Sequence, residues 1–212
     1  MNKQIEEKLI GIVLDNIHND LSHDFGHIYR VYKLATKIAI AENADLDVVI
    51  PAALFHDIFV YKGTGITRDE HVDSSNFAEK TLLQISNYPK EKINMVKYAI
   101  SVCSFTKGII PDTLDAKILQ DADLLESTGA ISIMRTFASA VTMTKLFYNK
   151  DDPFCEQRKP DPTKYAVDLF FFRLFLAQGR MHTKTAKNMA IRRTEFLKQF
   201  ISELRLELDE LD

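Results

Sequence analysis

The chain has 212 residues, of which 46% are hydrophobic and 27% charged, so it can bury a core and is not intrinsically disordered. Its 27 basic and 30 acidic side chains give a net charge of −3, which provides no overall electrostatic basis for binding nucleic acid. Only seven Gly, six Pro and two Cys are present, which argues against a turn-rich β fold and a disulfide framework and favours helices.

Apolar residues recur at helical spacing along most of the chain. The predicted helices cover about residues 5–19, 23–42, 46–60, 70–86, 90–103, 114–127, 128–149, 164–178 and 183–208. A glycine-containing loop is expected at 61–70, and the polar, proline-rich segment 149–164 is the only internal boundary that the sequence suggests. Because no strand-like alternation appears, we predict one all-α domain over 1–212 with no significant sheet.

Three features predict a cytoplasmic protein. The first residues contain no basic segment followed by an apolar run, so no signal peptide is expected. The most hydrophobic stretch, residues 165–179, is interrupted by Asp168 and Arg173 and falls short of a membrane span. Cys103 and Cys155 are expected to be free thiols in a reducing compartment.

Three short motifs place metal-binding side chains on otherwise apolar helices. In chain order they are the histidines His23 and His27, the adjacent pair His56 and Asp57, and the aspartates Asp121 and Asp123. A buried ionised carboxylate is costly unless it is paired or coordinates a cation. Imidazole and carboxylate together form a ligand set that divalent transition metals accept, and helical bundles commonly hold metals in their cores. One metal site would therefore explain all three motifs.

The motifs resemble those of the HD superfamily of metal-dependent phosphohydrolases, and most closely its small bacterial nucleotide pyrophosphohydrolases. The resemblance is carried by HDFGHIYRV, AALFHDI and ILQDADLLESTGAI followed by the arginine of IMRTF. It runs from about His23 to Phe137 and covers the central half of the chain. It implies an HD-domain helical bundle with core motifs over 23–137 and a helical C-terminal extension over 164–212.

By the same resemblance, one divalent transition metal ion would be bound by His27, His56, Asp57 and Asp123. Mn²⁺ is the first expectation, with Fe²⁺, Co²⁺, Ni²⁺ and Zn²⁺ as alternatives. Residues two apart on a helix point about 200° from each other, so only one aspartate of the third motif can face the metal. Periodicity places Asp121 nearer the core side and Asp123 nearer its flank, and the choice of Asp123 rests on the resemblance.

The count of histidines favours a single metal. Relatives with two metals, such as cyclic-dinucleotide phosphodiesterases and di-iron oxygenases, need further histidines between the His-Asp pair and the last aspartate. Here only His71 lies in that interval. Asp69, Glu70 and His71 could handle protons, but they fit a helix N-terminus slightly better.

The resemblance implies hydrolysis of a nucleotide or related phosphate compound at a phosphoester or phosphoanhydride bond by metal-activated water. One such reaction converts a nucleoside triphosphate to a monophosphate plus pyrophosphate. Asp57 is the candidate general base, with an acidic residue on a neighbouring loop as the alternative, and His23 is a second candidate catalytic residue. The candidate phosphate contacts are His23, Lys62, Arg68, Lys107 and Arg135.

The alternative function is a non-catalytic HD-fold module that binds nucleotides or transmits a signal. Retention of all four ligand positions favours the hydrolase, because degenerate modules usually lose ligands. The expected partner is a small nucleotide or phosphate substrate, without nucleic acid or membrane. The phenylalanine-rich segment near residue 170 fits a core as well as an interface, so a homodimer is left open.

Overall fold

The computed structural model describes residues 1–17, 25–61 and 68–210. Across these residues it contains nine α-helices and three short 3₁₀ helices, and an isolated bridge between Leu146 and Tyr165 is the only β pairing. The prediction of an all-α fold is therefore confirmed. None of the described helices is long and apolar enough to cross a membrane.

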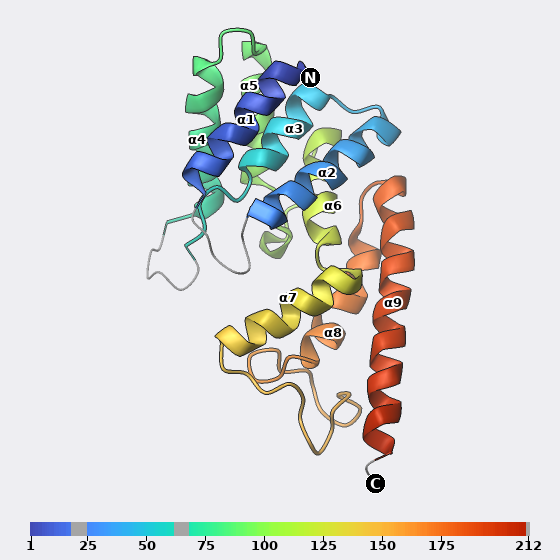
Figure 1. Ribbon diagram of the computed structural model, residues 1–212. Helices are drawn as coiled ribbons and strands as arrows, with labels where there is room; N and C mark the ends of the chain where they lie inside the picture. The colour runs from blue at the N-terminus through green and yellow to red at the C-terminus, as the bar shows by residue number, and fades with distance from the viewer. Residues whose placement is uncertain (18–24, 62–67, 211–212) are drawn as a thin grey trace. The chain divides into compact units, whose positions relative to one another are not determined.

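The chain divides into two compact units, Met1–Asp123 and Leu124–Asp212 (Figure 1). The polar segment 149–164, suggested by the sequence as the internal boundary, lies inside the second unit. The helices of the first unit are α1 (Lys3–Asn16), α2 (Phe25–Glu42), α3 (Leu46–Phe55), α4 (Glu70–Gln84), α5 (Ile93–Ser101) and α6 (Leu114–Leu125), with 3₁₀ turns η1 (Lys90–Lys92) and η2 (Phe105–Lys107). The final two residues of α6 belong to the second unit.

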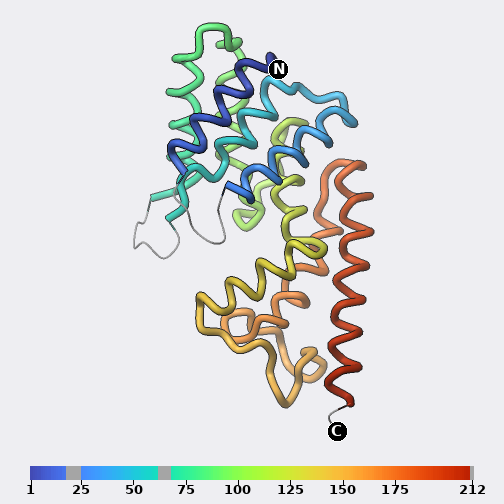
Figure 2. Tube along the Cα trace, viewed as in Figure 1, coloured from blue at the N-terminus to red at the C-terminus, as the bar shows by residue number. Residues whose placement is uncertain are grey.

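Helix α3 is the centre of the first unit, where it packs against α1, α2, α4 and α5 (Figure 2). Every residue from Val48 to Phe55 is buried, as expected for a helix that is apolar on all sides. Pro51 lies inside this helix and has no N–H to donate to the carbonyl of Asp47. The hydroxyl of buried Tyr88 donates to that carbonyl instead, at 2.7 Å.

Helix α3 ends at Phe55, so the predicted helix over 46–60 is wrong in its last five residues. The chain turns there, with the amide of Ile58 donating to the carbonyl of Phe55 at 3.3 Å. The amide of Phe59 donates to Ser74 Oγ of α4 rather than to a helical carbonyl. The His-Asp pair therefore lies in a turn at the end of the most buried helix.

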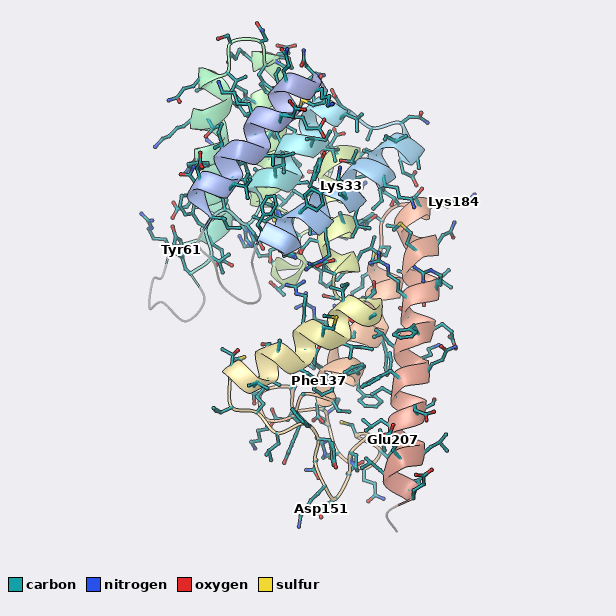
Figure 3. The ribbon with its side chains drawn as sticks, in the orientation of Figure 1. Lys33, Tyr61, Phe137, Asp151, Lys184 and Glu207 are labelled. Carbon is teal, nitrogen blue, oxygen red and sulfur yellow. The ribbon has the colours of Figure 1, made fainter. Side chains whose placement is uncertain are left out.

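The second unit contains α7 (Gly129–Thr142), α8 (Asp168–Phe172), the 3₁₀ helix η3 (Leu174–Arg180) and α9 (Lys184–Asp209). Its core is built from Phe154, Val167, Phe170, Leu174, Leu197 and Ile201. Phe137 of α7 packs against this core (Figure 3). Phe170 stacks on Phe200 with ring centroids 5.6 Å apart, so this part of the phenylalanine-rich segment is core.

Two predicted helices of the second unit are shorter than expected. Helix α7 ends at Thr142 instead of near 149, and Thr144 then adopts a left-handed conformation with φ of 52°. The backbone next pairs Leu146 with the 164–166 segment, through Leu146 N to Lys164 O at 3.0 Å and Ala166 N to Leu146 O at 2.9 Å. The predicted helix over 164–178 is likewise divided into α8 and η3.

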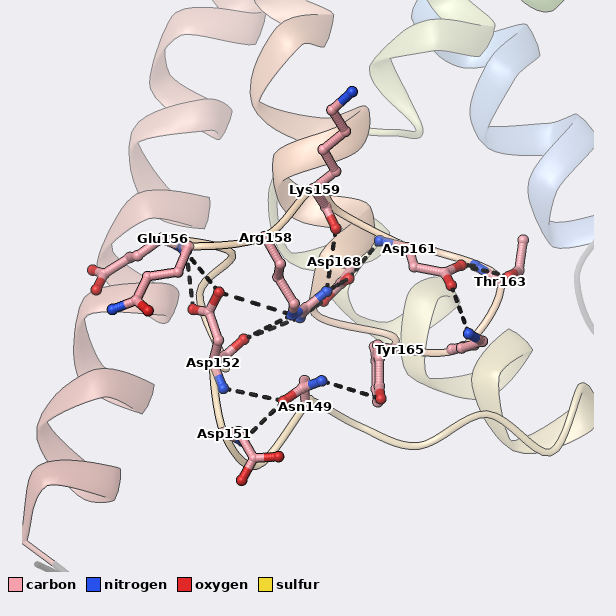
Figure 4. Close-up of polar contacts among 12 residues, drawn as sticks. Asn149, Asp151, Asp152, Glu156, Arg158, Lys159, Asp161, Thr163, Tyr165 and Asp168 are labelled. Atoms are coloured by element: carbon pink, nitrogen blue, oxygen red, sulfur yellow. Dashed lines mark hydrogen bonds and ion pairs between the residues drawn. The ribbon is translucent and has the colours of Figure 1, made fainter.

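A buried carboxylate organises the 149–164 connection (Figure 4). Asp168 is fully buried and accepts from Arg158 Nη1 at 2.5 Å, from Arg158 Nη2 at 2.7 Å and from the amide of Asp161 at 2.6 Å. The charge is thereby compensated by a two-pronged guanidinium contact and a backbone donor. The contact between Arg158 and Asp168 holds in place a segment whose composition predicts only a loop.

We expect Tyr88→Phe to lower the free energy of unfolding by about 1–3 kcal/mol, because it leaves the part-buried carbonyl of Asp47 without the donor that replaces the missing N–H of Pro51. Urea unfolding of both proteins measures the change. Tyr98→Phe is the matched control, since the hydroxyl of Tyr98 bonds to exposed Asp112 at 3.2 Å. An equal decrease in the free energy of unfolding of the two variants would show that the hydrogen bond from Tyr88 to the Asp47 carbonyl stabilises the fold no more than an exposed one.

Candidate metal centre

His27 lies in the first turn of α2, on the face that packs into the first unit. Its side chain is 1% exposed. The Nε2 atom lies 3.4 Å from Asp57 Oδ2 and 3.6 Å from Asp123 Oδ1. An imidazole nitrogen thus faces two carboxylates that come from different parts of the chain.

His56 follows the last residue of α3 and is also 1% exposed. Its Nδ1 lies 2.8 Å from the carbonyl oxygen of Ala53. Because a carbonyl can only accept, Nδ1 carries the hydrogen and Nε2 presents a lone pair. That Nε2 atom is buried, lies 3.6 Å from Asp57 Oδ2 and has no hydrogen-bond partner among the described residues.

Asp57 joins the two histidines into one cluster. The ligand atoms that His27, His56 and Asp57 contribute all lie within 4.8 Å of one another. Two imidazole nitrogens and carboxylate oxygens are a donor set that suits Mn²⁺, Fe²⁺, Co²⁺, Ni²⁺ and Zn²⁺. The buried His56 Nε2 would gain a partner from such an ion, so these residues fit a divalent metal.

Helix α6 carries both aspartates of the third motif. Asp123, in the last turn, places Oδ1 3.6 Å from His27 Nε2, and its side chain is 28% exposed. Asp121 is fully buried. The 3.6 Å distance to His27 Nε2 makes Asp123 the candidate from this motif for completing the cluster.

His71 is the residue near the cluster that the sequence analysis assigned to a helix N-terminus. Asp69 does cap α4, but the imidazole of His71 is buried and its Nδ1 lies 4.0 Å from Asp57 Oδ1. The spacing of His71 with the buried residues Ser74, Ser75, Ala78 and Leu82 puts it on the inner face of α4, a signal that was available in the sequence.

Cys103 lies behind His71, with Sγ 3.4 Å from His71 Nδ1. Burial raises the pKa of the Cys103 thiol, and the nearby carboxylates of Asp57 and Asp123 raise it further. The side chain is therefore a neutral thiol at physiological pH. It contributes a weak hydrogen-bonding group beside the imidazole rather than an anionic ligand.

Two of the predicted phosphate contacts are held in ion pairs at the start of α4. Arg68 Nε lies 3.0 Å from Asp73 Oδ2, and Arg68 Nη2 donates to the hydroxyl of Tyr61 at 2.9 Å. Lys107 Nζ donates to Asp69 Oδ2 at 2.6 Å. Both cations line an open polar pocket together with His71, Ser104 and Thr106.

The other three predicted contacts are placed differently. Arg135, on α7 of the second unit, lies with Nη1 3.7 Å from the carboxylate of Glu126, which is buried. His23 and Lys62 lie outside the described residues. A role in binding phosphate remains a prediction for Arg68, Lys107 and Arg135.

Comparison with known proteins identifies the family. The model of the HD domain family matches residues 24–128. YpgQ, an uncharacterized protein of Bacillus subtilis (strain 168), is 30% identical over 194 residues, which cover 90% of this chain and 86% of YpgQ. This chain belongs to the HD family. Membership supports a metal-dependent phosphohydrolase in general terms, and HD domains bind divalent metals.

Solved HD structures agree with this fold over nearly the whole chain. The crystal structure of B. subtilis YpgQ in complex with ADP has a TM-score of 0.74 and 28% identity, covering 96% of this chain and 95% of that one. An HD-superfamily hydrolase from Bacillus thuringiensis has a TM-score of 0.74 and 27% identity, with 98% of each chain covered. The similarity therefore extends beyond the matched domain to the C-terminal helices.

The start of α4 should be sensitive to acid. The Lys107 ammonium holds the pKa of Asp69 below its usual value, assisted by the amides of Val72 and His71. Because the folded-state pKa is depressed, the charge of Asp69 stabilises the fold above the unfolded-state pKa of about 3.9 and stops doing so as pH falls through the folded value.

We expect Asp69→Asn, which can still cap the helix, to be less stable than the parent at pH 7 and equally stable at low pH. Urea midpoints at pH 7, 5, 4 and 3 measure the difference. The same substitution at Asp151, whose side chain is 81% exposed, is the control. A difference that persists undiminished at pH 3 would contradict the ion pair with Lys107.

Proposed function

We propose that this chain is a metal-dependent phosphohydrolase that acts on a nucleotide or a related phosphate compound. The observation that carries the proposal is the buried Nε2 of His56, which has no hydrogen-bond partner among the described residues and lies 3.6 Å from Asp57 Oδ2. A buried polar atom without a partner is costly, and a bound cation would remove that cost. His27 and Asp57 supply two further ligand atoms at the same place.

The proposed ligands are His27, His56, Asp57 and Asp123, holding one divalent transition metal ion with Mn²⁺ as the first candidate. When bound, the ion supplies Lewis-acid chemistry that acidifies a water molecule and polarises a phosphoryl group. His27, His56, Asp57 and Asp123 would hold the ion, and the water and a phosphate oxygen of the substrate would bind beside them.

Asp57 is the proposed general base. In hydrolysis the water oxygen bonds to phosphorus, the bond from phosphorus to the leaving oxygen breaks, and Asp57 takes up the water proton. The acidic residues at the neighbouring loop are already engaged. Asp69 caps α4 and pairs with Lys107, while Glu70 Oε2 accepts from the amide of Tyr61 at 2.8 Å.

Two of the proposed phosphate contacts, Lys107 and Arg68, would each exchange a protein carboxylate for a substrate phosphate. Lys107 and Arg68 line the pocket that includes His71, and His71 in turn neighbours Asp57. His23, Lys62 and Arg135 are kept as candidate contacts from the sequence. Charge on a transferred phosphoryl group would be neutralised by these side chains.

The nucleotide assignment is supported by the complex of B. subtilis YpgQ with ADP. A nucleoside triphosphate cleaved to a monophosphate and pyrophosphate is the proposed reaction within this class. The cytoplasmic location and a homodimeric state remain predictions.

The test is release of phosphate and pyrophosphate from a nucleotide panel. Protein stripped with EDTA is reconstituted in turn with Mn²⁺, Co²⁺, Ni²⁺, Mg²⁺ and Zn²⁺. We expect metal-dependent release, and we expect His56→Ala and Asp57→Ala to reduce kcat/KM by more than the roughly 10–100-fold typical of residues that only support a ligand. Asp112→Asn, an exposed carboxylate bonded to Tyr98, is the matched control.

Nucleotide binding without release under any metal would favour the non-catalytic module, for which the ADP complex of YpgQ is the supporting observation. Release that is unaffected by EDTA, or retained in both variants, would contradict a metal-dependent reaction at this cluster.

A further inference from the structure

The backbone of His71 is anchored at the start of α4. Its amide donates to Asp69 Oδ1 at 3.0 Å, and Asp69 is anchored in turn by Lys107 at 2.6 Å. The side chain is on the buried face of α4, which packs against α5. From this position on α4, Nδ1 of the ring lies 4.0 Å from Asp57 Oδ1.

Cys103 contacts the same nitrogen of this ring. Its Sγ lies 3.4 Å from His71 Nδ1, within hydrogen-bonding range for sulfur. Cys103 itself follows α5, and its amide donates to the carbonyl of Ile100 at 3.2 Å. Gln120 Nε2 donates to the carbonyl of the preceding residue, Val102, at 3.1 Å, so the segment is tied to α6.

The two oxygens of Asp57 face different groups. Oδ2 lies 3.4 Å from His27 Nε2 and 3.6 Å from His56 Nε2, whereas Oδ1 lies on the side of His71. Rotation about the bond between Cβ and Cγ would exchange these oxygens or turn both away from the cluster. A polar group that engages Oδ1 therefore sets the direction in which Oδ2 points.

We propose that His71 is a positioning residue for the metal centre: Nδ1, which lies 4.0 Å from Asp57 Oδ1, closes on that oxygen when a metal is bound and keeps Oδ2 directed at His27 and His56. Cys103 maintains the orientation of the ring. This role rests on the proposed function, because it presumes a metal at the cluster. Residues that orient metal ligands through hydrogen bonds commonly change metal affinity by about 10–100-fold when they are replaced.

Substitutions can test whether Nδ1 or Nε2 of His71 is the nitrogen that positions Asp57. In His71→Asn the side-chain amide reaches the position of Nδ1, and in His71→Gln it reaches that of Nε2. We expect His71→Ala and His71→Gln to weaken Co²⁺ binding by about 10–100-fold, and His71→Asn to restore most of the loss. Competition with a chromophoric chelator measures the affinity. The visible spectrum of bound Co²⁺ reports the ligand set, which should be the same in every His71 variant.

His56→Ala is the control for loss of a ligand, and thermal unfolding of each metal-free protein controls for folding. If His71→Ala binds Co²⁺ like the parent while His56→Ala does not, the positioning role is wrong and the metal centre stands. If His71→Ala changes the Co²⁺ spectrum as His56→Ala does, His71 is a ligand and the positioning role is again wrong. If the parent binds no Co²⁺, Mn²⁺ or Zn²⁺, both the proposed function and the role of His71 fail.

Discussion

The buried cluster of His27, His56 and Asp57 is the constraint on which the first unit depends. Two imidazoles are buried beside a carboxylate that is only 14% exposed, and the Nε2 of His56 has no hydrogen-bond partner among the described residues. Polar groups buried in this way raise the free energy of the fold unless a ligand satisfies them. A divalent cation is the ligand that matches all three donors, so metal binding and stability of this unit should be linked.

His56 and Asp57 of the cluster directly follow α3, the most buried helix. Helix α3 is apolar on every side, and Tyr88 satisfies the carbonyl that Pro51 leaves without a helical donor. Because α3 stops at Phe55, His56 and Asp57 project from a turn that is anchored by a rigid core. Catalytic and metal-binding side chains are held most precisely when they are supported in this manner by packed helices.

Much of this arrangement could be predicted from the sequence, because it depends on local periodicity and short motifs. Short motifs on apolar helices predicted that His27, His56 and Asp57 converge, and their ligand atoms lie within 4.8 Å of one another. Asp123, whose choice over Asp121 rested on the family resemblance and not on periodicity, lies 3.6 Å from His27 Nε2. His71 does lie at the N-terminus of α4, as predicted, but its 4.0 Å distance from Asp57 Oδ1 depends on how α4 packs and could not be predicted from the sequence.

The helix predictions that are wrong in the second unit also failed because of contacts that form only in the folded chain. The predicted helix over 164–178 is divided, and the preceding loop is folded around Asp168, which pairs with Arg158 ten residues earlier. Such a pairing cannot be read from a helical period. The sequence did not indicate that Arg68 would pair with Asp73, or Lys107 with Asp69. Those contacts form only in the folded chain.

The most direct measurement is anomalous diffraction from a crystal of this protein grown with Mn²⁺, recorded where manganese absorbs strongly. We predict one strong anomalous peak within coordination distance of His27 Nε2, His56 Nε2 and Asp57 Oδ2. Asp123, not Asp121, should lie beside this peak. A cluster without a peak at saturating Mn²⁺, or a peak held by other residues, would contradict the assignment of this cluster as the metal centre.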